Sequence, residues 1–148
     1  MRQKHRLVRI VLFFYLAVLF YLMFIGFSRS PSELYMYNLK PFSTIKNYFV
    51  YFDHYNLSTW VINIVGNIGV FVPVGLLLPL YDKGLQNFFR FIFVFGAGIT
   101  TLEALQLSFR VGSFDVDDII LNTLGASIGY MLWKLISLTK LIRFFSNH

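Results

Sequence analysis

The sequence EALQLSFRVGSFDVDDIILNTLGASIGY (residues 103–130) carries charged and amide side chains between two long apolar stretches. These side chains belong to Glu103, Gln106, Arg110, Asp115, Asp117, Asp118 and Asn122. An ionised side chain at the centre of a spanning helix costs about 3 kcal/mol on insertion scales. Charges kept next to apolar helices therefore indicate pairing or function, and this stretch is the first candidate for a site.

The composition is typical of an integral membrane protein. The chain has 148 residues, of which 57% are hydrophobic and 14% charged, and its mean hydropathy is +0.64. A soluble domain usually has roughly a quarter of its residues charged. The length allows one small bundle and no separate soluble domain.

Composition also excludes several kinds of site and partner. There is no cysteine, so disulfides and thiolate metal sites are excluded. The three histidines, His5, His54 and His148, lie far apart, and a histidine zinc site is not expected. The net charge of +6 comes from basic residues that flank apolar segments, so we expect no nucleic-acid binding.

Four apolar segments are long enough to cross a membrane as helices: 10–27, 60–80, 91–109 and 118–139. A spanning helix needs about 20 such residues. The predicted fold is all-α, a single domain over residues 1–148 that forms an integral membrane bundle of four transmembrane helices. The first segment follows a basic leader like that of a signal peptide, but no A-x-A-like cleavage site follows it, so we expect a retained helix.

The distribution of basic residues predicts the orientation. One side of the predicted membrane holds Arg2, Lys4, Arg6, Arg9, Lys83, Arg90, Lys134, Lys140 and Arg143, and the other holds Arg29, Lys40, Lys46 and Arg110. Because cytoplasmic loops carry the excess of lysine and arginine, the richer side is predicted to be cytoplasmic. We therefore expect a multi-pass plasma-membrane protein with both termini in the cytoplasm.

The longest connection, 28–59, is rich in aromatic residues and extracytoplasmic in this topology. Phe42, Ile45, Phe49 and Phe52 recur at helical spacing, which predicts a short interfacial helix with its apolar face toward the membrane. Two interpretations remain open for this connection. It is either a linker that follows the membrane surface or a lid beside the polar cluster.

Polar residues recur on one face of three predicted helices. Glu103, Gln106 and Arg110 have i, i+3, i+7 spacing, which places them on one helix face. Asn63 and Asn67 form the second polar face, and Asp115, Asp118 and Asn122 form the third. All three faces are predicted in the outer half of the membrane, where they would form a pocket open to the outside. The candidate binding residues are Asn63, Asn67, Glu103, Gln106, Arg110, Asp115, Asp117, Asp118 and Asn122.

These residue types suit several kinds of chemistry. Arginine can bind phosphate or carboxylate through two hydrogen bonds, so Arg110 is a candidate for holding an anionic group. Glu103 and Asp118 are candidates for a catalytic base. The aspartates of the D-x-D-D motif, Asp115, Asp117 and Asp118, are weak candidates for a divalent cation site. Apart from this cation, no cofactor is predicted. The sequence contains no G-x-S-x-G nucleophile motif, no phosphate-binding P-loop and no H-E-x-x-H metal motif.

Structural roles compete with these functions. In one alternative, Arg110 neutralises Glu103 or Asp118, and the asparagines only bridge helices. In another, Ser113 caps the fourth helix and the aspartates complement its dipole.

Small residues and prolines predict how the helices pack. Gly125 and Gly129 form a G-x-x-x-G motif, and Gly66 and Gly69 lie on the second segment, so we expect close helix packing at both pairs. Prolines in VFVPVGLLLPL (residues 70–80) predict a bend of the second segment below Asn67.

The sequences NIVGNIGVFVPVGLLLPL (63–80) and EALQLSFRVGSFDVDDIILNTLGASIGYML (103–132) together resemble the VanZ-like membrane proteins. The positions that carry the resemblance are Asn63, Asn67, Phe71, Pro73, Gly75, Glu103, Gln106, Arg110, Asp115, Asp117, Asp118, Asn122, Gly125 and Gly129. The namesake of this family is associated with low-level resistance to teicoplanin, a lipidated glycopeptide that binds cell-wall precursors outside the membrane. The resemblance therefore implies a bacterial cell-envelope function and does not identify a mechanism.

Three functions remain open from the sequence. The first is binding of an envelope amphiphile such as a membrane lipid, a lipid-linked cell-wall precursor or a lipoglycopeptide, with a contribution to teicoplanin resistance. The second is an intramembrane enzyme that acts on a lipid or isoprenoid-phosphate head group. The third is a structural or accessory subunit. The oligomeric state is not predicted.

Overall fold

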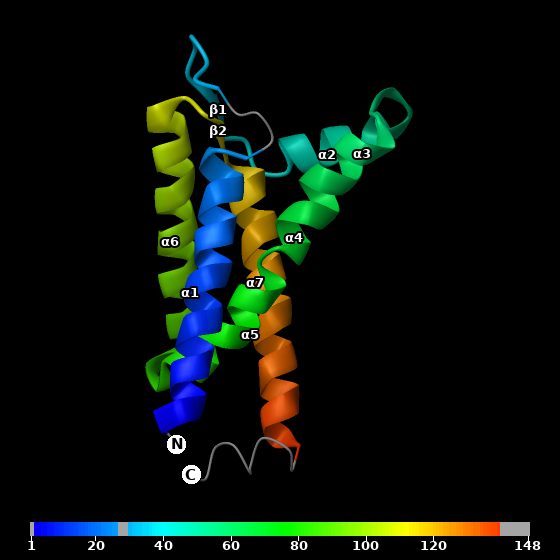
Figure 1. Cartoon of the computed structure of the whole chain (residues 1–148). Helices are drawn as coiled ribbons and strands as arrows, with labels where there is room; N and C mark the ends of the chain where they lie inside the picture. Colours follow the sequence, from blue (N-terminus) through cyan, green and yellow to red (C-terminus); the bar gives the residue numbers. More distant parts are fainter. Residues whose placement is uncertain (1, 27–29, 140–148) are drawn as a thin grey trace.

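The computed structural model describes residues 2–26 and 30–139 and contains four helices long and apolar enough to cross a membrane (Figure 1). They are α1 (Arg2–Phe24), a composite second span over Leu57–Tyr81, α6 (Phe88–Phe109) and α7 (Val116–Leu138). The predicted all-α bundle of four spans is thereby confirmed. Residue 27, where the sequence predicts the end of the first span, lies outside the described residues.

The second span is irregular. It consists of α3 (Leu57–Val61), a π-helical segment η2 (Ile62–Gly66), α4 (Asn67–Gly69) and α5 (Val72–Tyr81). The helix is interrupted between α4 and α5, because Pro73 has no backbone N–H and is suited to the first turn of a new helix. The predicted break below Asn67 is therefore confirmed. Figure 1 shows α3 and α4 leaning away from α6 at the end of the bundle where α2 lies.

Glycines on α5 and α7 allow α7 to touch α4 and α5 backbone to backbone. A Cβ added at Gly125 would overlap the backbone of Ile68, and one at Gly129 would overlap that of Val72. A Cβ at Gly75 would overlap the backbone of Ala126. The packing predicted for Gly125 and Gly129 is confirmed.

The same prediction is wrong for the other glycine pair. A Cβ at Gly69 would meet nothing within 4 Å, and the nearest atom to one at Gly66 would be the carbonyl oxygen of Val61, 3.7 Å away. Neither Gly66 of η2 nor Gly69 of α4 is needed for a close approach of another helix, because Ile68 is the residue whose backbone meets α7.

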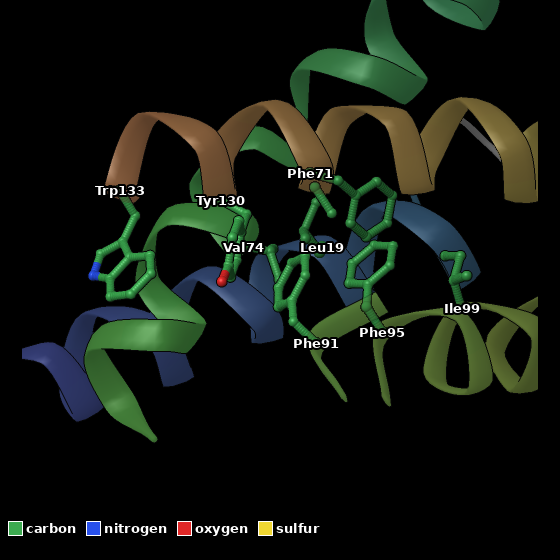
Figure 2. Close-up of a cluster of buried hydrophobic side chains, with 9 residues drawn as sticks. Leu19, Phe71, Val74, Phe91, Phe95, Ile99, Tyr130 and Trp133 are labelled. Atoms are coloured by element: carbon green, nitrogen blue, oxygen red, sulfur yellow. The ribbon is translucent and has the colours of Figure 1, made fainter. Parts of the chain in front are cut away.

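The apolar core lies between α1, α5, α6 and α7. Figure 2 shows Phe91 and Phe95 of α6 facing Phe71 and Tyr130. Phe71 and Phe95 pack edge to face, with ring centroids 5.5 Å apart. The Tyr130 hydroxyl donates a hydrogen bond of 2.5 Å to the carbonyl oxygen of Gln86. The polar residues of the spans lie beyond this core, toward the end of the bundle where α2 lies.

That end, here called the loop end, is built from the two connections that follow α1 and α6. They pair as a short parallel sheet, with β1 (Met36–Asn38) aligned to β2 (Ser113–Asp115) (Figure 1). The sequence analysis predicts no strands, since three-residue segments in polar loops have no recognisable periodicity. The sheet joins the loop that precedes α2 to the loop that precedes α7.

The connection after β1 contains the predicted short helix, observed as α2 (Ser43–Val50), followed by the single turn η1 (Phe52–His54). Phe49 and Phe52 pack edge to face on Trp60 of α3, with centroid distances of 5.8 and 5.7 Å. The apolar face of this segment therefore packs partly on the second span.

Candidate functional site

A cavity of about 390 Å³ lies among all four spans, next to the loop end. Its lining is Leu19, Leu22, Met23, Ile62, Asn63, Gly66, Asn67, Val70, Phe71, Glu103, Gln106, Ser113, Asp118 and Asn122. The structure thus brings together most of the candidate residues from the sequence. Arg110, Asp115 and Asp117 are candidates that do not line it.

The α6 wall of the cavity carries Glu103 and Gln106. Their i, i+3 spacing places both on the inward face, where they are 3% and 5% exposed. Gln106 Nε2 donates a hydrogen bond of 2.8 Å to the carbonyl oxygen of Met23 in α1. Gln106 therefore connects two spans and satisfies a carbonyl near the end of α1 that has no partner within that helix.

The second span contributes two asparagines. Asn63 lies in the π-helical segment, and its Nδ2 donates to the carbonyl oxygen of Thr59 at 2.8 Å. Asn67 Nδ2 donates to Asp118 Oδ1 of α7 at 2.7 Å. Single π-helical turns are often found at functional sites, because the wider turn redirects the side chains around it.

Asn122 of α7 is the most informative residue of the lining. It is 2% exposed, and its buried Oδ1 accepts no hydrogen bond from any residue that the structure describes. Buried amides nearly always have partners, because an unsatisfied one costs about 1–3 kcal/mol. Asn122 is therefore a buried polar residue of the cavity wall whose Oδ1 no described side chain or backbone group satisfies.

Asp115 begins α7. Its side chain accepts a hydrogen bond of 2.8 Å from the backbone N–H of Asp117, so Asp115 is the N-cap of this helix. The alternative that Ser113 caps α7 is wrong, and Ser113 lines the cavity instead. Asp115 also accepts a hydrogen bond of 2.7 Å from Thr44 Oγ1 and one of 3.3 Å from Asn38 Nδ2.

Asp117 holds the start of α2. It is fully buried and accepts hydrogen bonds from the backbone N–H groups of Phe42, Thr44 and Ile45, at 2.5, 2.7 and 3.0 Å. A carboxylate is favourable there, because the first N–H groups of a helix lack partners within the helix. The D-x-D-D motif is therefore divided: Asp115 and Asp117 hold the connection before α7, and Asp118 lines the cavity.

Arg110 forms the end of α6. Its backbone is left-handed, with φ 59°, and its carbonyl oxygen accepts a hydrogen bond of 2.8 Å from the N–H of Ser32. Its exposed guanidinium lies over the ring of Tyr35, 5.8 Å from the centroid.

Tyr48 of α2 lies near Asp118, a residue of the cavity lining, although its place in the sequence does not mark it as a site residue. Burial raises the pKa of the Tyr48 phenol, and Tyr55 and the carboxylates of Asp118 and Asp115 raise it further. Tyr48 therefore stays protonated near the polar wall of the cavity. The sequence also gives no signal that Asn38 and Thr44 bind Asp115, because they lie in an aromatic loop whose spacing predicts only a helix face.

The described residues contain no group of three or more histidine, cysteine, aspartate or glutamate side chains placed to hold a metal ion. The carboxylate oxygens of Asp115 and Asp117 accept hydrogen bonds from Thr44 and from backbone N–H groups. Asp118 instead lines the cavity. The D-x-D-D motif therefore does not form a compact carboxylate cluster in this structure.

Comparison with known proteins identifies the family that the sequence matches. The sequence model of the VanZ/LLP1 family matches residues 12–137. Protein VanZ of Enterococcus faecium is 35% identical over 71 residues, which are 48% of this chain and 44% of that protein. The match thus spans less than half the length of this relative. No solved structure matches the chain significantly.

Proposed function

Because the chain belongs to the VanZ/LLP1 family, we propose that this membrane protein binds the polar group of a cell-envelope amphiphile in the cavity among its four spans. The distribution of lysine and arginine supports an orientation with the loop end outside the cytoplasm. In that orientation the cavity takes its ligand from the outer leaflet.

The observation that carries the proposal is a cavity of suitable size among the spans whose lining combines apolar side chains with Asn67, Glu103 and Asp118. Ligand pockets usually measure about 300–1,000 Å³ and combine apolar walls with a few polar groups that orient the ligand. This cavity has both kinds of wall. The apolar walls favour an amphiphile over a ligand that is polar throughout.

The cavity also has an apolar side suited to an acyl chain. Leu19 and Leu22 of α1 and Val70 and Phe71 below α4 line it. Ile62 lines it as well and is 53% exposed. A ligand whose head group binds in the cavity can therefore extend its chain past Ile62 into the surrounding lipid.

A contribution to teicoplanin resistance follows from this proposal if the amphiphile is a lipid-linked precursor or the lipidated glycopeptide. The test uses a strain that lacks the gene, complemented with wild type, Asn122→Ala or Ser127→Ala. Ser127 is a matched control on α7, since its hydroxyl bonds only to its own helix, at Thr123. Susceptibility to teicoplanin and to a glycopeptide without a lipid chain is measured at equal membrane abundance.

We expect wild type and Ser127→Ala to lower susceptibility to teicoplanin alone, and Asn122→Ala to lose this effect at unchanged abundance. Full activity of Asn122→Ala would rule out a binding role for the cavity. Loss of abundance in Asn122→Ala would instead favour a structural subunit, in which the polar residues only hold helices together.

A second candidate is an intramembrane enzyme acting on a lipid head group, favoured by the presence of Glu103 and Asp118 in the same cavity. One of them would act as base, and a divalent cation would serve as electrophile. Chelator-sensitive turnover of a lipid or isoprenoid phosphate by the purified protein would support it. Absence of turnover across a broad lipid panel would count against it.

A further inference from the structure

The amide side chains of the cavity are oriented by groups that can only accept hydrogen bonds. Asn63 donates to the carbonyl oxygen of Thr59, and Gln106 donates to that of Met23. Asn67 donates to a carboxylate oxygen of Asp118. Since carbonyl and ionised carboxylate oxygens are acceptors only, the amide nitrogen must face each of them.

This orientation leaves the amide oxygens for the cavity. A side-chain amide turns as a unit, so holding the nitrogen toward the protein directs the oxygen away from that contact. The side-chain oxygens of Asn63, Asn67 and Gln106 accept no hydrogen bond from any residue that the structure describes. All three residues line the cavity, and each offers it an acceptor.

The remaining polar lining consists of two carboxylates and of Ser113 and Asn122, which can both donate and accept, so acceptors outnumber donors. Glu103 and Asp118 contribute carboxylates, which are acceptors when ionised. The described lining contains no lysine or arginine, and Arg110 lies outside it over Tyr35. A phosphate or carboxylate has acceptors of its own and would face like partners here. A group with N–H or O–H donors would be complementary.

We propose that the cavity selects a head group rich in hydrogen-bond donors, either a primary ammonium or sugar hydroxyls, over an anionic group that offers only acceptors. The inference rests on the proposed function, because it names the chemistry that the same cavity recognises. It also replaces the sequence-based expectation that Arg110 holds an anionic group of the ligand.

The test compares lipids that differ in the head group. The purified full-length chain in phosphatidylcholine nanodiscs is titrated with phosphatidylethanolamine, a monoglucosyl diacylglycerol or phosphatidic acid, and bound lipid is counted by native mass spectrometry. Phosphatidylcholine is the reference, since its quaternary ammonium has no N–H. An ammonium or a glucosyl head group is expected to be retained about tenfold more than the reference, as for one additional hydrogen bond to a charged group.

Two variants test whether the preference comes from the cavity. Glu103→Gln replaces an acceptor oxygen with an amide donor and should reduce the preference about tenfold. Thr101→Val is the control on α6, because its exposed hydroxyl bonds only to Ala97 of its own helix. The lipid ranking of the wild type decides the proposal even where a variant does not fold.

Each outcome separates the possibilities. Retention of phosphatidylethanolamine alone identifies an ammonium ligand, and retention of the glucosyl lipid alone identifies a sugar ligand. Preferential retention of phosphatidic acid would overturn the donor inference and leave amphiphile binding intact. Retention of all lipids at the level of phosphatidylcholine would overturn the donor inference, while amphiphile binding is tested separately by the teicoplanin susceptibility of the complemented strains.

Discussion

Replacing Asp117 with alanine should release α2 from the end of α7 without unfolding the bundle. The carboxylate accepts three backbone N–H bonds, from Phe42, Thr44 and Ile45. A hydrogen bond to a charged group contributes about 1.5–3 kcal/mol, but the freed N–H groups can bind water at the loop end. We therefore expect a net loss of about 3 kcal/mol in the attachment of α2, or about 100-fold more frequent opening.

Hydrogen–deuterium exchange of the full-length protein in nanodiscs measures this opening directly. Peptides covering residues 42–45 should exchange about 100-fold faster in Asp117→Ala, and about tenfold faster in Asp117→Asn, which keeps one acceptor oxygen but loses the charge. Asp53→Asn is the matched control, because Asp53 is exposed in η1 and belongs to the same connection.

The reasoning would be refuted by unchanged exchange at 42–45 in a folded Asp117→Ala protein. Faster exchange throughout α7 would also refute it, since the carboxylate would then stabilise the span itself rather than the attachment of α2.

Further substitutions test the packing and the connection between spans. Gly75→Ala should destabilise the bundle, because the added methyl group would overlap the backbone of α7. Gly69→Ala has open space and should be tolerated. Thermal melting in detergent distinguishes the two variants, and equal melting midpoints would contradict the close packing. Gln106→Leu should cost about 1 kcal/mol by removing the hydrogen bond to Met23, with Thr101→Val as control. Faster exchange near the end of α1 is the readout, and unchanged exchange there would exclude this role.

The membrane-spanning character follows from the sequence because hydropathy and length are local properties. Each span needs about 20 apolar residues, and no tertiary contact is required to recognise such a segment. The packing of Gly125 and Gly129 is predictable for a similar reason, since a small-residue motif on a spanning helix has few other uses. The same argument fails for Gly69, because the motif does not say which face meets another helix.

The cavity is only partly predictable. Spacing places Glu103 and Gln106 on one helix face, and the structure sets that face against the other spans. Spacing does not identify the group that a side chain will meet. The neighbours Asp117 and Asp118 show this, because one binds the backbone of α2 and the other lines the cavity.

An all-α bundle of four spans with its polar residues toward one end is predictable from the sequence, because hydropathy is a local property and charge at the bilayer centre is costly. The tertiary structure decided which of these residues share a cavity and which hold the loop end. It also decided that Asn63, Asn67 and Gln106 turn their nitrogens toward protein acceptors. Hydrogen-bond orientation depends on partners that are distant in the chain, and only the packed helices bring those partners together.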